Sequence, residues 1–204
     1  MSALPDDQQT PAPGRPGLRE RKKARTRAAI REHAFRLFRE QGYDATTVDQ
    51  IADAAEVSPS TFFRYFPTKE DVVLQDDMDT RWADAVRAQA PGLSPLAALR
   101  AAIPATFAGL APGQLQLLQE SSELATSVPA VRARFLDEFG RTIGVVAAAV
   151  AERSGRDPSD PAVLTLAGAV MGVVMAAWFA AGDLPGMMAL LQQGLALLEE
   201  GLPL

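Results

Sequence analysis

The sequence predicts an all-α protein in which a compact three-helix module precedes a larger helical domain. Apolar residues recur at intervals of three and four, and no Asn-Gly or Asp-Gly pair marks a hairpin. Breaks rich in glycine and proline separate segments of helix length. Residues 15–69 hold 12 Lys and Arg against 7 Asp and Glu, whereas residues 70–204 hold 8 against 16. We therefore expect a small basic module on an acidic body.

The composition is that of a folded protein without thiol chemistry. The chain has 204 residues, of which 48% are hydrophobic, enough to fill a core. It has no cysteine, which excludes disulfides, a thiol nucleophile and thiolate metal sites. Residues 1–16 carry acids and prolines where a secretion signal would have cations and an apolar run. These features predict a disordered tail and a cytoplasmic protein.

The first two helices are indicated by apolar spacing and by their ends. From about residue 18 to residue 41, apolar residues recur at i, i+4, i+7 and i+8 starting at Ile30. Gly42 follows, where a helix C-terminus favours glycine. The sequence TVDQ, residues 47–50, is a capping box that predicts the start of a short second helix.

The third and fourth helices are delimited by serine, threonine and proline. Ser58 followed by Pro59 predicts a cap and a first-turn proline, and Pro67 ends this third helix. Thr68 caps a fourth helix, which we expect to run without interruption past Trp82.

Further breaks divide the rest of the chain into five or six helices. The module is thus predicted as residues 17–68 and the helical ligand-binding and dimerisation domain as residues 69–204. The breaks lie at residues 92–95, 110–113, 127–129, 155–161 and 182–186.

An uncharged segment between Asp160 and Asp183 is long enough to span a bilayer. Residues 162–182 therefore support a competing hypothesis, a membrane-anchored helical protein. The segment is rich in Ala and Gly, is bounded by acids and lacks flanking Lys and Arg anchors. The spacing of Gly168 and Gly172 permits close helix approach, which favours a buried interface or core helix and no membrane.

The run PSTFFRYF, residues 59–66, distributes its aromatic side chains over two helix faces. Phe62 and Phe66 are four residues apart and are predicted to enter the core. Phe63 and Tyr65 then face outward beside polar and basic residues, a surface suited to sugars, thymine methyl groups and phosphates. The second and third helices form a helix-turn-helix, whose later helix enters the major groove. The alternative is a small helical subdomain whose aromatic residues are covered by the rest of the chain.

Residues 26–73 closely resemble the DNA-binding domain of the TetR family of bacterial regulators. The similarity includes AFRLFREQGYDATTV, IADAAEVS and YFPTKED. It implies an N-terminal three-helix helix-turn-helix DNA-binding domain joined to a C-terminal helical domain that binds a small molecule. The resemblance further implies a homodimer formed by the last two long helices, and a double-stranded DNA operator as partner.

The resemblance also implies which residues contact DNA. Thr47 and Lys69, each at the start of a helix, match phosphate contacts, and residues 59–61 match the start of the recognition helix. Phe63 stands where the family usually has tyrosine, which removes a hydroxyl that Arg64 would have to replace. The implied set is Thr47, Pro59, Ser60, Thr61, Phe63, Arg64, Tyr65 and Lys69.

A basic run precedes this module. Residues 15–27 carry seven Lys and Arg against the single acid Glu20. Such a run is either a solvated helix start or a segment that follows the DNA backbone or enters a minor groove. Both interpretations remain open.

Residues 115–155 and 176–202 are similar to effector domains of TetR regulators that bind acyl-CoA-like ligands. Basic residues are few for a coenzyme A headgroup, so fatty acids and aromatic or drug-like ligands remain alternatives. Larger side chains among small ones are pocket candidates, and three of them share a helix face at i, i+4 and i+7. The candidates are Trp82, Phe107, Phe139, Met171, Met175 and Trp178.

No catalytic constellation stands out. The single histidine, His33, lies beside the apolar stripe of the first helix, and there is no phosphate loop or Ser/His/Asp set. We expect no enzyme activity, no cofactor and no metal site. The sequence is interpreted as a homodimeric, ligand-responsive, sequence-specific regulator, specifically a repressor released by a small molecule. A DNA-binding regulator without a ligand is the remaining alternative.

Overall fold

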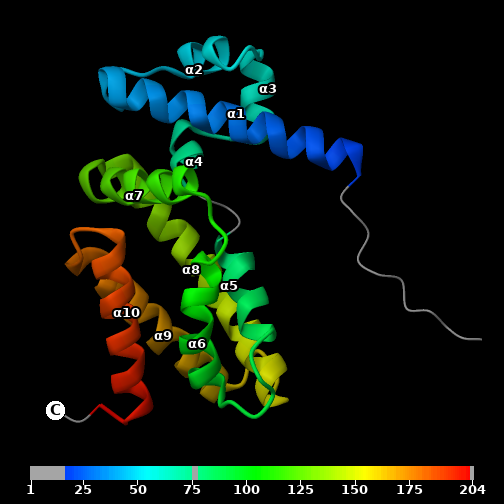
Figure 1. Cartoon of the computed structure of the whole chain (residues 1–204), viewed down its shortest axis with the longest axis vertical. Helices are drawn as coiled ribbons and strands as arrows, with labels where there is room; N and C mark the ends of the chain where they lie inside the picture. Colours follow the sequence, from blue (N-terminus) through cyan, green and yellow to red (C-terminus); the bar gives the residue numbers. More distant parts are fainter. Residues whose placement is uncertain (1–16, 75–77, 203–204) are drawn as a thin grey trace, which may run out of the picture.

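The computed structural model describes residues 17–74 and 78–202 (Figure 1). These residues form ten helices and no strand, as the predicted all-α class requires. The predicted disordered tail, residues 1–16, lies outside the described residues.

The N-terminal module contains α1 (Leu18–Gln41), α2 (Val48–Ala54) and α3 (Pro59–Tyr65). The side chain of Thr47 caps α2 in a capping box with Gln50. The side chain of Ser58 accepts from the Thr61 backbone N–H and caps α3. Both caps are those that the sequence predicts.

The core of the module places Phe62, Phe63 and Phe66 as expected, but Tyr65, expected to face outward, packs partly against this core. Phe62 and Phe66 are almost fully buried against α1, whereas Phe63 is 50% exposed. Tyr65 is half-buried. The buried residues that α1 and α2 contribute to this core are Ile30, Ala34, Phe35, Phe38, Ile51 and Ala52.

The prediction that one continuous helix runs from Thr68 past Trp82 is wrong. The chain forms α4 (Lys69–Val73) and a separate α5 (Met78–Arg87), and Leu74 between them is extended, with φ −75° and ψ 142°. In a continuous helix the carbonyl of Val73 would accept from the backbone four residues later. Here the Val73 carbonyl accepts from two side-chain donors, Arg31 Nη2 at 3.2 Å and Ser121 Oγ at 2.8 Å.

The C-terminal domain adds five helices, each starting at or next to a proline. Figure 1 shows α4 and α7 between the N-terminal module and the other C-terminal helices, which extend away from it. The helices are α6 (Pro95–Phe107), α7 (Pro112–Ser127), α8 (Pro129–Ser154), α9 (Pro161–Ala180) and α10 (Leu184–Glu199).

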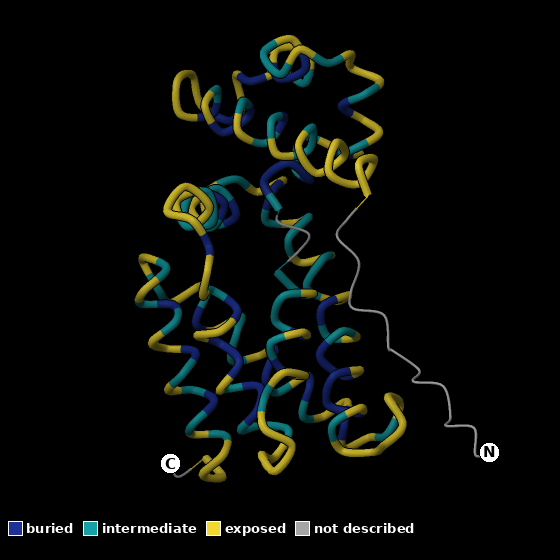
Figure 2. The backbone as a smooth tube through the Cα atoms, turned by 45° about the vertical axis from the view of Figure 1, so that its right-hand side comes forward, coloured by how far each residue is buried: buried dark blue, intermediate teal, exposed yellow. Residues whose placement is uncertain are grey.

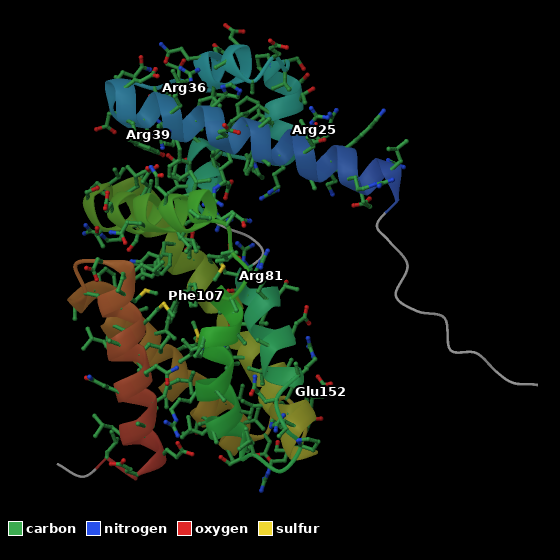
Figure 3. All side chains as sticks on the ribbon, viewed as in Figure 1. Arg25, Arg36, Arg39, Arg81, Phe107 and Glu152 are labelled. Carbon is green, nitrogen blue, oxygen red and sulfur yellow. The ribbon has the colours of Figure 1, made fainter. Side chains whose placement is uncertain are left out.

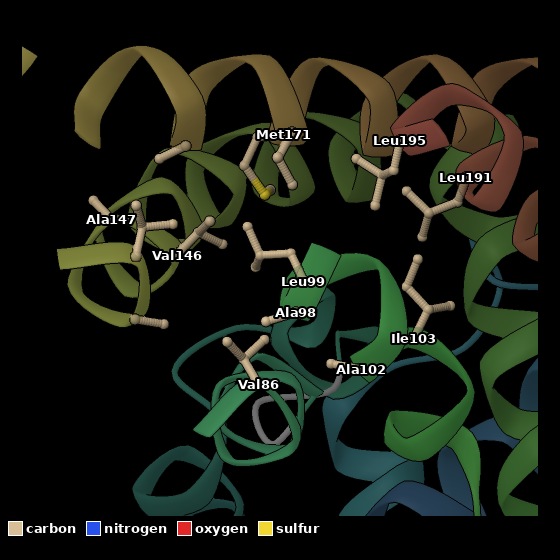
Figure 4. Packing of buried hydrophobic residues seen from close by; sticks show 14 of the residues in the cluster. Val86, Ala98, Leu99, Ala102, Ile103, Val146, Ala147, Met171, Leu191 and Leu195 are labelled. Atoms are coloured by element: carbon tan, nitrogen blue, oxygen red, sulfur yellow. The ribbon is translucent and has the colours of Figure 1, made fainter. Parts of the chain in front are cut away.

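The core of this domain lies between α5, α6, α8, α9 and α10 (Figure 4). Leu99, Met171 and Leu195 are buried there from three different helices. At Gly194 of α10 an added Cβ would lie 2.4 Å from Val173 Cγ1 of α9. The close approach of these two helices therefore depends on Gly194, and not on the glycines of α9.

Helix α9 coincides with the uncharged segment. By length and hydropathy it could cross a membrane, and 28% of its most apolar stretch is buried inside the protein. Val163, Ala167 and Val170 belong to the core, whereas Gly168 and Gly172 are exposed. Within the protomer α9 is thus a core helix on one side, with an unpartnered opposite side.

Candidate DNA-binding surface and ligand cavity

The outward face of α3 carries most of the expected DNA-contacting residues. Pro59, Ser60, Phe63 and Arg64 are all exposed. The guanidinium of Arg64 lies over the Tyr65 ring, 5.5 Å from its centroid. The α3 surface therefore presents a cation, an aromatic ring and a hydroxyl side by side, groups that suit phosphate and base contacts.

Two of the expected DNA-contacting hydroxyls lie at helix caps, Thr47 as the cap of α2 and Thr61 bonded to the cap of α3. Thr61 is half-buried, and its Oγ1 accepts from Ser58 Oγ at 2.9 Å. Thr47 is exposed at the start of α2, where its Oγ1 accepts from the Gln50 backbone N–H at 3.2 Å. Each hydroxyl keeps its own proton available for an acceptor outside the protein.

Lys69 has a structural role that sequence reasoning missed. Its ammonium donates to the carbonyls of Tyr43 and Thr46, both at 2.9 Å, and lies 4.0 Å from the centroid of the Tyr43 ring. These partners precede Lys69 by more than twenty residues, so no local pattern could reveal them. One of the three N–H donors of the ammonium is left for a phosphate.

Tyr43 connects the same region to α4. Its side chain is buried, and its hydroxyl donates to Glu70 Oε1 at 2.8 Å. Burial, reinforced by the hydrogen bond to Glu70, raises the pKa of the Tyr43 phenol well above its usual range. The loop before α2 is thus fixed to the start of α4 by both Tyr43 and Lys69.

A cavity of about 210 Å³ lies in the C-terminal domain, beneath the N-terminal module. Five of the six candidate ligand-binding residues line it, and Figure 3 labels one of them, Phe107, on α6. Met175 does not line it, because the α9 wall runs through Met171, Val174 and Trp178. The five that line it are Trp82, Phe107, Phe139, Met171 and Trp178.

One wall of the cavity is a row of aromatic rings from α8 and α9. The rings of Phe135 and Trp178 stack with centroids 4.6 Å apart, and Phe139 lies 6.2 Å from Phe135. Phe135 was missed by sequence reasoning, since the only signal available was its spacing of four residues from Phe139. Trp178 Nε1 is buried without a hydrogen-bond partner among the described residues.

The charged residues of the lining are both acidic. Asp79 accepts from Thr142 Oγ1 at 2.6 Å. Glu138 pairs with Arg134 at 3.4 Å and with Arg141. Among the described residues no Lys, Arg or His lines the cavity. The interior therefore suits an apolar molecule and offers no cation to an anionic headgroup.

Arg134 joins this cavity to the start of α4, next to the N-terminal module. Its Nε donates to Asp71 Oδ1 at 2.6 Å, and its Nη1 reaches Glu138 of the lining. Asp71 in turn accepts from the backbone N–H and hydroxyl of Thr68, both at 2.9 Å, and so completes the capping box in which Thr68 caps α4. A continuous set of polar contacts thus runs from the cavity wall to the start of α4.

Both parts of the chain match known families of bacterial regulators. Residues 30–75 match the family model for bacterial regulatory proteins of the tetR family, and residues 93–203 match that for the MftR C-terminal domain. The HTH-type transcriptional regulator TcmR of Streptomyces glaucescens is 35% identical over 182 residues, covering 84% of this chain and 80% of TcmR.

Two further similarities concern repressors. An HTH-type transcriptional repressor of Mycobacterium tuberculosis is 32% identical over 124 residues, covering 58% of this chain and 65% of the repressor. The crystal structure of Thermus thermophilus FadR, a TetR-family transcriptional repressor in complex with lauroyl-CoA, superposes with a TM-score of 0.53 at 27% identity. The superposition covers 87% of this chain and 95% of that one.

Proposed function

The chain belongs to the TetR family of bacterial transcriptional regulators, and from this premise we propose that it is a cytoplasmic repressor released from its operator by an apolar ligand. The members of the family are transcriptional regulators and not enzymes. They bind DNA operators, dimerise and bind small molecules.

The recognition surface is proposed to be the exposed face of α3. Phe63 would pack on sugar or a thymine methyl group, and Arg64 would bind a phosphate that a tyrosine hydroxyl would otherwise contact. Thr47 and the remaining N–H of Lys69 would bind phosphates at the ends of α2 and α4. Pro59, Ser60, Thr61 and Tyr65 complete the proposed contact set.

The dimer is proposed to form through α9 and α10. Leu164 and Phe179 of α9 and Leu190 and Leu197 of α10 are large apolar residues that remain between 39% and 48% exposed in the protomer. Exposed apolar side chains on two adjacent helices are typical of a subunit interface. This face also accounts for the hydropathy of α9 without a membrane, so the membrane-anchored alternative is not favoured.

The ligand is proposed to occupy the cavity with an acyl chain or another apolar group. The observation that carries this proposal is the apolar lining of aromatic and methionine side chains, together with the absence of cations among the lining residues that the structure describes. FadR, which is similar in fold, was crystallised with lauroyl-CoA. Here a coenzyme A headgroup would lie outside the cavity, since the charged lining residues are acidic.

Selection of duplexes from random DNA, followed by mobility-shift titration, tests the proposal. We expect the dimer to select a sequence with two half-sites about one helical turn apart, as two symmetric recognition helices require. Lauroyl-CoA, lauric acid and a planar aromatic drug are then titrated against the preformed complex. Equal release by the thioester and the free acid would mean that the headgroup is not recognised.

Two outcomes would overturn the proposal. If no duplex is selected, the chain does not act as a sequence-specific regulator. If a duplex is selected but none of the three compounds releases it at any soluble concentration, the acyl-type ligand is excluded and regulation without such a ligand is favoured.

A further inference from the structure

The first two turns of α1 project from the body of the protein. Every residue from Gly17 to Arg25 is exposed, and the start of α1 is correspondingly yellow in Figure 2. The first buried residue of α1 is Ile30. We call residues 18–25 the basic segment. Its helix continues directly into the packed part of α1, so it is held as a rigid extension of the DNA-binding domain.

The basic segment carries five cations and one acid. None of the cations forms an ion pair or a side-chain hydrogen bond with another described residue. Glu20 alone opposes them, which leaves a net charge of +4 on eight residues. The cations are Arg19, Arg21, Lys22, Lys23 and Arg25.

Neither packing nor helix electrostatics explains these cations. Leu18 is 63% exposed, and Gly17 provides no side-chain cap. Positive side chains at a helix N-terminus oppose the macrodipole, and like charges at i, i+3 and i+4 repel one another. An anionic partner would remove both unfavourable effects, which makes the arrangement typical of a phosphate-binding surface.

The basic segment lies next to the C-terminal end of α3. Arg27 Nη1 donates to the carbonyl of Tyr65 at 3.1 Å, and its guanidinium lies 4.4 Å from the centroid of the Phe66 ring. Helix α1 therefore crosses the C-terminal end of the recognition helix at Arg27. From Arg25 the basic segment continues for roughly another 10 to 12 Å, at 1.5 Å per residue. Figures 1 and 3 show this part of α1, with Arg25 on it, extending beyond α3.

We propose that the basic segment is a second DNA-binding surface, which contacts phosphates flanking the major groove that holds α3. This inference rests on the proposed function, because it requires α3 to be the recognition helix. The segment is rich in long cationic side chains, so it supplies affinity that does not depend on base sequence. It lengthens the footprint of each protomer beyond the bases that α3 reads.

The test uses the full-length dimer and two duplexes, one selected by the protein from random DNA and one of scrambled sequence. The variant combines Arg19→Gln, Arg21→Gln, Lys22→Gln, Lys23→Gln and Arg25→Gln. Glutamine retains helix propensity, and circular dichroism checks that the helix content is unchanged. Filter binding over a range of salt concentrations gives the slope of log affinity against log salt.

A second comparison keeps the net charge matched. The double variant Lys22→Gln with Lys23→Gln is compared with Arg87→Gln with Arg156→Gln. The second pair removes two exposed cations of the C-terminal domain, one at the end of α5 and one after α8. Both double variants change the protein charge equally. A general effect of net charge would therefore alter the two salt slopes alike.

We expect the fivefold variant to reduce the salt slope by at least about 2 units on both duplexes, since each lost phosphate contact in each protomer contributes about 0.9. The preference for the selected duplex should remain within about threefold of the parent, because phosphate contacts position the protein and do not read sequence. If the parent selects a duplex but the salt slopes of the variants equal those of the parent and the Arg87/Arg156 control, this inference fails and the proposed function stands. If the parent selects no duplex, both fail together.

Discussion

Adjacent phenylalanines in α3 have separate roles. Phe62 is fully buried in the module core, whereas half of the Phe63 surface is exposed. We predict that Phe63→Ala weakens operator binding by about 1 to 3 kcal/mol, the range expected for one lost base or sugar contact. The measurement is a mobility-shift titration of the selected duplex, combined with thermal unfolding. The melting temperature should fall much less than for a fully buried phenylalanine, because half of the Phe63 surface is already exposed.

The matched control is Phe62→Ala. It removes a ring of the same size from the core and should lower the free energy of unfolding by about 3 to 5 kcal/mol. If Phe63→Ala instead destabilises the fold as much as Phe62→Ala and binds operator as tightly as the parent, the outward face of α3 is not the DNA-binding surface.

Tyr43 is expected to lower the free energy of unfolding at alkaline pH. Its folded-state pKa is raised, by burial first and by the hydrogen bond to Glu70 second, so the folded state favours the protonated phenol. The stabilisation is fully present below the unfolded-state pKa of about 10 and is lost as the pH rises above it. We predict that the free energy of unfolding of the parent falls more steeply above about pH 10 than that of Tyr43→Phe. Urea denaturation at a series of pH values measures both, and parallel curves would contradict the prediction.

Residue roles were predictable from the sequence where neighbours in the chain decide them. The spacing of Phe62 and Phe66 identifies them as core residues and leaves Phe63 outside, as found. Lys69 is different, because its ammonium is fixed by the carbonyls of Tyr43 and Thr46 across the module. Only the folded chain brings those groups together.

Helix α9 carries glycines that the protomer does not need. An added Cβ at Gly172 would meet nothing within 4 Å, and Gly172 is exposed. A glycine at this position is explained by a second copy of the chain packed against α9. We predict that Gly172→Leu yields folded monomers with greatly reduced operator affinity, because a monomer binds only one half-site. Sedimentation measures the oligomeric state, and circular dichroism the fold.

Gly144→Leu is the control for this variant. Gly144 is also an exposed helical glycine with open space around its Cα, but it lies on α8 and outside the proposed interface. It should remain dimeric. A dimer that persists in Gly172→Leu would mean that the interface lies elsewhere.

Caps and prolines in the sequence indicated most helix boundaries. The prediction that α4 continues past Trp82 was wrong for a specific reason. The sequence from Thr68 to Trp82 contains no proline or glycine and is compatible with one helix. The side chains of Arg31 and Ser121 occupy the Val73 carbonyl and end the helix there. Because Arg31 is 42 residues before Val73 and Ser121 is 48 residues after it, helical periodicity carried no sign of the break.

At the scale of the whole molecule, Arg134 is positioned to couple the cavity to the DNA-binding domain. It contacts Glu138 of the cavity wall and Asp71, which belongs to the capping box at the start of α4. We predict that Arg134→Gln reduces the effect of a bound acyl ligand on operator affinity. If the parent shows a hundredfold effect, the coupling is about 2.7 kcal/mol, and the variant should lose a large part of it. Operator affinity is measured with and without lauroyl-CoA.

Arg141→Gln is the control for Arg134→Gln. It also removes a cation that pairs with Glu138, and so tests whether that loss alone weakens the coupling between ligand and operator. Arg141 pairs with Glu138 but, among the described residues, forms no ion pair or hydrogen bond with α4, so its substitution should leave the coupling close to that of the parent. Thermal unfolding of Arg134→Gln is measured in parallel, because Asp71 loses an ion-pair partner. Equal ligand response in the parent and in both variants would show that the signal travels by another route.

The position of the two indole side chains has a practical consequence. The chain contains only two tryptophans, Trp82 and Trp178, and both line the cavity. The intrinsic tryptophan fluorescence of the protein therefore originates entirely at the cavity, with no contribution from the DNA-binding helices. Any compound that enters the cavity should change the wavelength or intensity of tryptophan emission. Ligands can therefore be screened by fluorescence of the unlabelled protein. Trp82→Phe and Trp178→Phe would each leave a single fluorophore, and so report separately on the α5 side and the α9 side of the cavity.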